Sequence, residues 1–225
     1  MDSVNPSPPP PSRQAMYLEF ALVCALSWMP FFYSGLGDYL GWRKPSSSPA
    51  DEVYSVFSAL AFSALPIFLI WRNGEPFRKL GFKPFELRDA IVAVVLFLAA
   101  IALVLIYRPI EHALVSQPGA VTSYRVHHGF PLPVESFIFL VSAFREEIFC
   151  RAYLCLRLRD FGLNRTRTAI LSALVFASYH IYEGWAALPV MFFFGLIFAG
   201  VFLNYRSLWP LVVAHACYNL LLRFT

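Results

Sequence analysis

Charged residues are scarce in this sequence, and their scarcity excludes an ordinary soluble protein. Of the 225 residues, 14% are charged and 58% are hydrophobic, whereas a soluble domain has roughly 25% charged residues. The mean hydropathy is +0.59. The net charge of +4 does not indicate nucleic-acid binding, because the basic residues lie between apolar segments. The composition is typical of a protein that crosses a membrane several times.

Cysteine is also rare, and the four cysteines all lie within or beside apolar stretches. A disulfide framework needs cysteines in paired loops, so none is expected. We expect these residues to be buried thiols without a redox role.

The N-terminus lacks the pattern of a cleaved signal peptide. Residues 1–14 read MDSVNPSPPPPSRQ, which predicts a disordered or extended Pro-rich tail. No short apolar core precedes a small-residue cleavage site, so we expect the first apolar segment to remain as an anchor. Internal repeats, which many transporters show, are not visible either.

Apolar segments long enough to cross a membrane, which takes about 20 residues, recur along the chain. Seven candidates lie at residues 15–33, 53–71, 89–107, 134–156, 168–183, 186–204 and 208–224. They predict an all-α fold, a polytopic transmembrane bundle of about seven helices. We expect a tail (1–14), N-terminal transmembrane helices (15–108), an outer loop (109–132) and a catalytic helical core (133–225) made by the last four helices.

The basic residues are unevenly divided between the two ends of such a bundle. If the helices alternate, eleven Lys and Arg residues lie on the side of the N-terminus and five on the other side, with two more inside the fourth segment. Cytoplasmic loops are enriched in Lys and Arg. The sequence therefore predicts an integral membrane protein with a cytoplasmic N-terminus.

Four charged residues lie in the interior of the fourth segment: Arg145, Glu146, Glu147 and Arg151. A charge at mid-bilayer costs about 2.5–3.5 kcal/mol or more, so these side chains must face protein or a wet cavity. Glu147 and Arg151 are four apart and can form an ion pair. Glu146 lies about 100° away on the helix and is expected to have no partner in its own helix. Arg145 points to another side, and we assign it no chemistry.

Three further polar residues lie at a similar depth on two other segments: His180, His215 and Asn219. Together with Glu146 and Glu147 they suggest one hydrated pocket. Peptide hydrolysis needs an activated water, donors for the oxyanion and a proton for the leaving amine. A Glu beside a His can deprotonate water, and a second His and an Asn can donate to the oxyanion.

A zinc site is an open alternative. Glu146, His180 and His215 could bind a catalytic zinc ion that keeps one position for water, although the HExxH pattern of many zinc peptidases is absent. Three histidines of the outer loop could also bind a metal, but a solvated loop is the simpler interpretation. These are His112, His127 and His128.

Three motifs in order resemble a known family. The stretch EEIFCR (146–151) is similar to its EExxxR motif, FASYH (176–180) to its FxxxH motif and HACYN (215–219) to its HxxxN motif. These motifs are typical of the CAAX-processing and bacteriocin-processing intramembrane proteases, the type II CAAX prenyl endopeptidase group. The resemblance covers about residues 134–224 and implies a helical membrane bundle with a cavity open to the bilayer.

The resemblance also implies roles for the motif residues. Glu146 and His180 would position and activate water, and His215 and Asn219 would form the oxyanion hole. Glu147 and Arg151 would support the site, and no cofactor would be required. The predicted function is that of an intramembrane endopeptidase, and the resemblance implies a prenylated CAAX-type or a leader-peptide substrate as candidates.

Two other functions are alternatives, a non-catalytic scaffold or immunity protein on the same fold and a small transporter. The expected partners are membrane lipid and a membrane-associated peptide or protein substrate, with no nucleic acid. A bacterial inner membrane is the expected location. The sequence does not specify the substrate, the cleavage position or the oligomeric state.

Overall fold

The computed structural model describes residues 12–42, 48–114, 130–222 and 224, and it contains helices but no strand within these residues. Nine α-helices occur there: α1 (Arg13–Ser27), α2 (Met29–Tyr39), α3 (Pro49–Arg72), α4 (Leu87–Leu114), α5 (Leu132–Glu147), α6 (Leu154–Asp160), α7 (Arg165–Tyr179), α8 (Leu188–Tyr205) and α9 (Trp209–Leu222). Shorter helical turns are η1 (Phe77–Leu80), the π-helical η2 (Ile148–Tyr153), η3 (His180–Glu183) and η4 (Trp185–Ala187).

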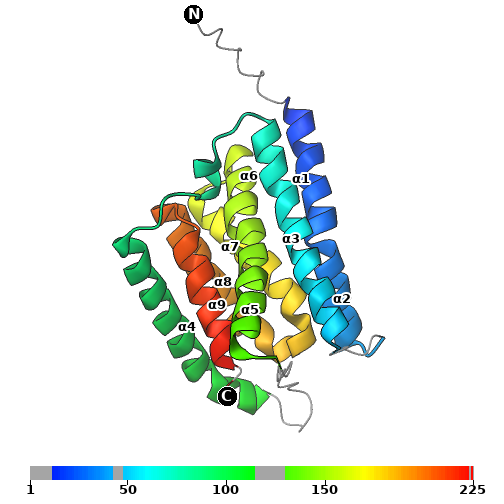
Figure 1. The fold of residues 1–225 in the computed structure, drawn as a ribbon, viewed down its shortest axis with the longest axis vertical. Coiled ribbons are helices and arrows are strands. Elements are labelled where there is room, and N and C mark those ends of the chain that lie inside the picture. Colours follow the sequence, from blue (N-terminus) through cyan, green and yellow to red (C-terminus); the bar gives the residue numbers. More distant parts are fainter. Residues whose placement is uncertain (1–11, 43–47, 115–129, 223, 225) are drawn as a thin grey trace, which may run out of the picture.

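These elements form seven rods that run alternately up and down (Figure 1). The helices α1 and α2 follow each other in one rod, and α5, η2 and α6 form another. The described N-terminal and C-terminal residues lie at opposite ends of the bundle. The predicted all-α bundle of about seven helices is confirmed. Helix α1 begins at Arg13, capped by the Ser12 side chain, so it starts just inside the expected tail; residues 1–11 lie outside the described part.

Four rods are long and apolar enough to cross a membrane by themselves. They are Arg13–Tyr39, Ala50–Arg72, Leu87–Glu111 and Trp185–Tyr205, while Trp209–Leu222 is apolar but shorter. The α5–α6 rod contains the charged residues of the fourth segment. Helix α7 has only 15 residues, fewer than the roughly 20 that a span needs. Helices α7 and α9 are therefore shorter than a full membrane span and depend on packing against the longer rods of the bundle.

The C-terminal rods form the buried centre and the N-terminal rods its lipid-facing cover. Half of the apolar window of α8 is buried, against 17% for α4 and for the α1–α2 rod. Helices α7 and α8 approach closely at Gly195, where an added Cβ would lie 3.0 Å from the Cα of Ala173. The missing side chain at Gly195 thus lets the two helices pack closely.

The loop boundaries and the cysteines differ in part from expectation. Helix α4 continues through Pro109 to Leu114, so it enters the stretch expected to be an outer loop; residues 115–129 lie outside the described part. Cys150 and Cys155 are buried, but Cys217 is exposed on α9. The expectation that all four thiols are buried is therefore wrong for Cys217, whose helix face is open to the surroundings.

The loop between α3 and α4 is fixed to α6 by a buried ion pair. The Arg157 guanidinium is 2.5 Å from a Glu75 carboxylate oxygen and 2.9 Å from an Asp160 oxygen. Arg157 is 1% exposed and Glu75 12% exposed. Burial raises the pKa of Glu75, but the hydrogen bonds and charges of Arg157 and Lys79 outweigh it, so the pKa lies below its ordinary value of 4.5.

Replacing Glu75 by Gln is expected to lower the free energy of unfolding by about 1.5–3 kcal/mol, since a hydrogen bond between charged groups is lost. Because the folded-state pKa of Glu75 is lowered, its stabilisation is complete above its ordinary pKa and is lost as the pH falls through the folded-state value. Melting in detergent should therefore separate wild type from Glu75→Gln at neutral pH, and the difference should shrink below about pH 4.5. The exposed Glu86→Gln is the matched control, and equal melting of Glu75→Gln and Glu86→Gln at neutral pH would contradict this role.

Candidate active site

The charged residues of the fourth segment lie where a regular helix changes into a wider turn. Helix α5 ends at Glu147, and η2 continues as a π-helix through residues 148–153. A π-turn changes the direction of the side chains that follow and is frequent at functional sites. The Cys150 carbonyl within this turn accepts a 2.8 Å hydrogen bond from the Ser172 hydroxyl of α7. The wide turn is thus stabilised by a neighbouring helix.

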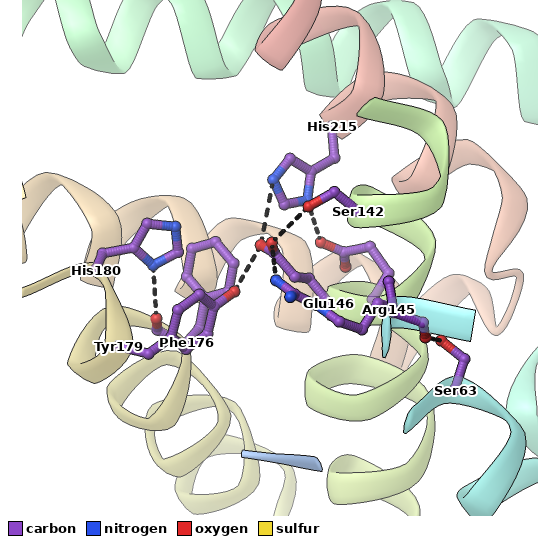
Figure 2. Close-up of polar contacts among 10 residues, drawn as sticks. Ser63, Ser142, Arg145, Glu146, Phe176, Tyr179, His180 and His215 are labelled. Atoms are coloured by element: carbon purple, nitrogen blue, oxygen red, sulfur yellow. Dashed lines mark hydrogen bonds and ion pairs between the residues drawn. The ribbon is translucent and has the colours of Figure 1, made fainter. Parts of the chain in front are cut away.

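Glu146 is buried, 8% exposed, and its carboxylate is surrounded by donors (Figure 2). Its Oε1 accepts from Ser142 at 3.2 Å and from Arg145 at 2.6 Å. Its Oε2 accepts from the Tyr179 hydroxyl at 2.5 Å and lies 3.6 Å from Nε2 of His215. The two oxygens therefore have different surroundings, and Oε2 faces the histidine.

Glu147 connects the α5–α6 rod to α9. It and Arg151 are completely buried, and their Oε2 and Nε atoms are 3.2 Å apart, which confirms the predicted ion pair. The other carboxylate oxygen of Glu147 is 2.8 Å from Nδ1 of His215. His215 thus lies between two carboxylates, and with its Nδ1–H directed to Glu147, its Nε2 is aimed at Glu146.

His180 lies on the other side of this centre, in the η3 turn that follows α7. Its Nδ1 is 2.8 Å from the Phe176 carbonyl oxygen, so a proton on Nδ1 leaves Nε2 as an acceptor. The Phe176 ring is 4.6 Å from the His180 ring and 5.9 Å from the His215 ring. Figure 2 shows His180 and His215 on either side of Phe176 and Tyr179. His180 therefore borders the site without a direct hydrogen bond to Glu146 within the described residues.

Asn219 is one turn beyond His215 on α9 and is partly exposed. Residues four apart lie on the same side of a helix, so its amide is on the His215 side. Its side chain makes no hydrogen bond or ion pair with another described residue. The amide is thus available to an added group.

Three hydrogen bonds to Glu146 were not predicted from the sequence. The expectation that Glu146 has no partner in its own helix is wrong, because the long Arg145 side chain bends to the adjacent carboxylate and Ser142 reaches it from one turn away. Tyr179 was also missed, although its position directly before His180 was a usable signal. The Arg145 guanidinium lies 3.7 Å from the centre of the Phe31 ring, a contact with α2 that no local pattern indicates.

A small cavity adjoins Glu146. It has a volume of about 10 Å³, close to the least that holds one water molecule. The lining comes from three rods: Ser27, Trp28, Phe31, Arg145, Glu146, Phe149, Cys150 and Tyr179. Ligand pockets have volumes of roughly 300–1,000 Å³, so this cavity is too small to hold a peptide.

The zinc alternative does not fit this arrangement. Within the described residues, no group of three His, Cys, Asp or Glu side chains is placed to hold a metal ion. Arg145 and Tyr179 occupy the Glu146 oxygens that would face the metal, and His180 is on the far side of Phe176. His127 and His128, and the side chain of His112, lie outside the described part.

One comparison with known proteins gives a match. Residues 129–221 match the family model described as "Type II CAAX prenyl endopeptidase Rce1-like". No curated protein and no solved structure matches the chain significantly. The matched segment contains the three motifs, and the resemblance read from them is confirmed. Residues 129–221 of this membrane protein are thus similar to the Rce1-like, type II CAAX prenyl endopeptidase family of proteases.

Proposed function

We propose that this protein is an intramembrane endopeptidase that hydrolyses a peptide bond of a membrane-associated substrate with a water activated by Glu146. One observation supports this most strongly. A buried carboxylate faces an oriented histidine, with Oε2 of Glu146 3.6 Å from Nε2 of His215, and Glu146 also lines a water-sized cavity. Both residues lie within the segment that matches a prenyl endopeptidase family.

In the proposed reaction, water enters between Glu146 and the acceptor Nε2 of His180. Glu146 takes a proton from the water as its oxygen attacks the peptide carbonyl carbon. The carbonyl oxygen becomes an oxyanion, to which the Asn219 amide and a protonated Nε2 of His215 donate. Glu146 then gives its proton to the amine nitrogen, the C–N bond breaks, and a carboxylic acid and an amine are released while Glu146 returns to its ionised form.

Glu147 and Arg151 support the reaction through His215. The 2.8 Å contact with Glu147 fixes the plane of the imidazole ring, and Arg151 holds Glu147 in turn. A carboxylate that orients a histidine in this way is a recurrent device of hydrolytic sites. We also propose that the end of the bundle bearing the N-terminus is cytoplasmic, because most basic residues lie there. A bacterial inner membrane stays a prediction.

The direct test is cleavage of two internally quenched peptides by the purified protein in detergent. One ends in a farnesylated CAAX sequence and the other is its unprenylated copy. We expect cleavage of the farnesylated peptide, and thorough chelation should leave the rate unchanged because the assigned residues need no metal. Loss of activity on chelation that zinc restores would reject the glutamate mechanism, and a wild type that cleaves neither peptide would reject the CAAX-type substrate.

Replacing Asn219 by Ala is expected to lower kcat/KM by about 10²–10³-fold, which is about 2.7–4 kcal/mol of transition-state stabilisation, as for other oxyanion donors. Initial rates on the peptide that the wild type cleaves give this ratio. Asn204→Ala, at the exposed end of α8, is the control and should keep full activity. Equal turnover of Asn219→Ala and wild type would exclude the amide from the oxyanion hole.

A further inference from the structure

Tyr179 has the shortest described contact with the Glu146 carboxylate. Its hydroxyl donates to Oε2 over 2.5 Å, within the range of strong charge-assisted O–H···O⁻ bonds. Tyr179 is 7% exposed, so water competes little for the contact. The same Oε2 faces Nε2 of His215. The phenol therefore acts on the carboxylate oxygen that is nearest to the histidine.

The backbone around Tyr179 is held in place by α1 and α2. The Trp28 indole donates to the Ser178 hydroxyl over 3.2 Å. Gly35 of α2 lies so close that an added Cβ would be 2.5 Å from the Tyr179 carbonyl oxygen. The Tyr179 ring packs at 4.3 Å from the His180 ring and at 5.7 Å from the Phe176 ring. These contacts fix the direction in which the hydroxyl points.

Several charged or titratable groups face Glu146 from the elements packed around it. They are Arg145 and Glu147 on α5, Cys150 on η2, Tyr179 on α7, His180 and Glu183 on η3 and His215 on α9. Of these, Arg145 binds Oε1, whereas Tyr179 alone among them donates a hydrogen bond to Oε2. The arginine thus balances the charge, and the tyrosine restrains the oxygen beside His215.

We propose that Tyr179 is a positioning residue for the hydrolysis assigned to Glu146: its hydroxyl holds Oε2 in place and stabilises the ionised base. The inference rests on the proposed function and adds a residue at an unspecified position of the FxxxH motif, directly before His180. A hydroxyl can donate or accept. It donates while Glu146 is ionised, and it can accept from the carboxylic acid after Glu146 has taken the proton of the water. The carboxyl group therefore keeps its orientation through both protonation states.

The first test measures protonation without any substrate. Infrared difference spectra of the full-length protein, recorded against pH, follow the carbonyl band of protonated Glu146, identified by its absence in Glu146→Gln. Tyr179→Phe keeps the ring but removes the donor, so the ionised form is less favoured. The midpoint of this titration should rise by about one to two pH units, a 10- to 100-fold change in the protonation constant. An unchanged midpoint would overturn the proposal.

The second test measures catalysis on the farnesylated CAAX peptide. In Tyr179→Phe we expect kcat to fall about 10- to 100-fold, as for a misplaced catalytic group, with KM within about twofold and the acidic limb of the pH profile moved upward by the same amount as the infrared midpoint. Tyr153→Phe, which removes another buried hydroxyl, should change none of these quantities. A parallel loss of activity and melting temperature without a shift of the acidic limb would reduce Tyr179 to a packing residue.

The two tests fail separately. If the wild type cleaves no peptide, the proposed function fails, and the infrared titration still shows whether Tyr179 controls Glu146. If the wild type cleaves and Tyr179→Phe keeps the wild-type kcat and pH profile, the proposed function stands and Tyr179 is not a positioning residue.

Discussion

Replacing Arg151 by Met is expected to lower the free energy of unfolding by about 3–5 kcal/mol, because Glu147 is left as a buried carboxylate without its cation. Both side chains are completely buried, so water cannot take over the lost interaction. The guanidinium also lies 4.0 Å from the centre of the Phe176 ring, and a cation in that position is attracted by the ring face. Detergent unfolding of the purified protein, followed by circular dichroism, measures the difference.

The double variant Glu147→Leu/Arg151→Met separates the cost of an unpaired charge from lost packing. Replacing a whole buried ion pair by apolar residues is often neutral or stabilising, so the double variant should recover most of the stability. It should not recover hydrolysis, because His215 loses the carboxylate that orients it. Arg167→Met, at an exposed position of α7, is the control. A double variant no more stable than Arg151→Met would contradict the ion-pair explanation.

The pairing of Glu147 with Arg151 was predictable, whereas its surroundings were not. Their spacing of four is a local property of any helix. A π-helical turn begins between them. This turn depends on Ser172 of another helix, whose hydroxyl donates a hydrogen bond to the Cys150 carbonyl. Such a contact between segments far apart in the sequence leaves no periodic signal in either segment.

The helical rods were predictable because each backbone N–H and C=O group of a helix inside the membrane must find its hydrogen-bond partner within the same segment. Apolar length therefore reveals each rod. The local sequence explains where the observed helices differ from the expected segments. The first expected span breaks at Trp28, where Pro30 starts the new helix α2, and α4 continues through Pro109.

The site was predictable in its residue types and only partly in its geometry. Motif spacing placed Glu146, His180 and His215 at one depth, but it could not show that Phe176 separates the two histidines. Motif spacing also gave no indication of the side chains that lie over Glu146. Phe31 belongs to α2 and contacts Arg145 across the bundle, and an aromatic residue in an apolar helix looks like any lipid-facing side chain.

Replacing Glu146 by Gln is expected to lower kcat by about 10²–10⁴-fold, the usual contribution of a general base. Gln has nearly the same shape and can still accept a hydrogen bond from Tyr179, but it cannot take a proton from water. The Arg145 ion pair is lost at the same time. Initial rates on the peptide that the wild type cleaves, with melting curves of both proteins, separate lost chemistry from lost folding.

The matched control for this prediction is Glu135→Gln, because Glu135 is a buried carboxylate on the same helix α5, 1% exposed, and lies away from the site. It lies three helical turns before Glu146, at the far end of α5 from the site. Its substitution should leave kcat within about twofold of wild type. If Glu146→Gln kept more than about a tenth of the wild-type kcat, a general base at this position would be excluded. If both variants lost activity together with melting temperature, the effect would come from removing a buried carboxylate from α5, and the hydrolytic base would have to be sought among the other titratable groups around the cavity.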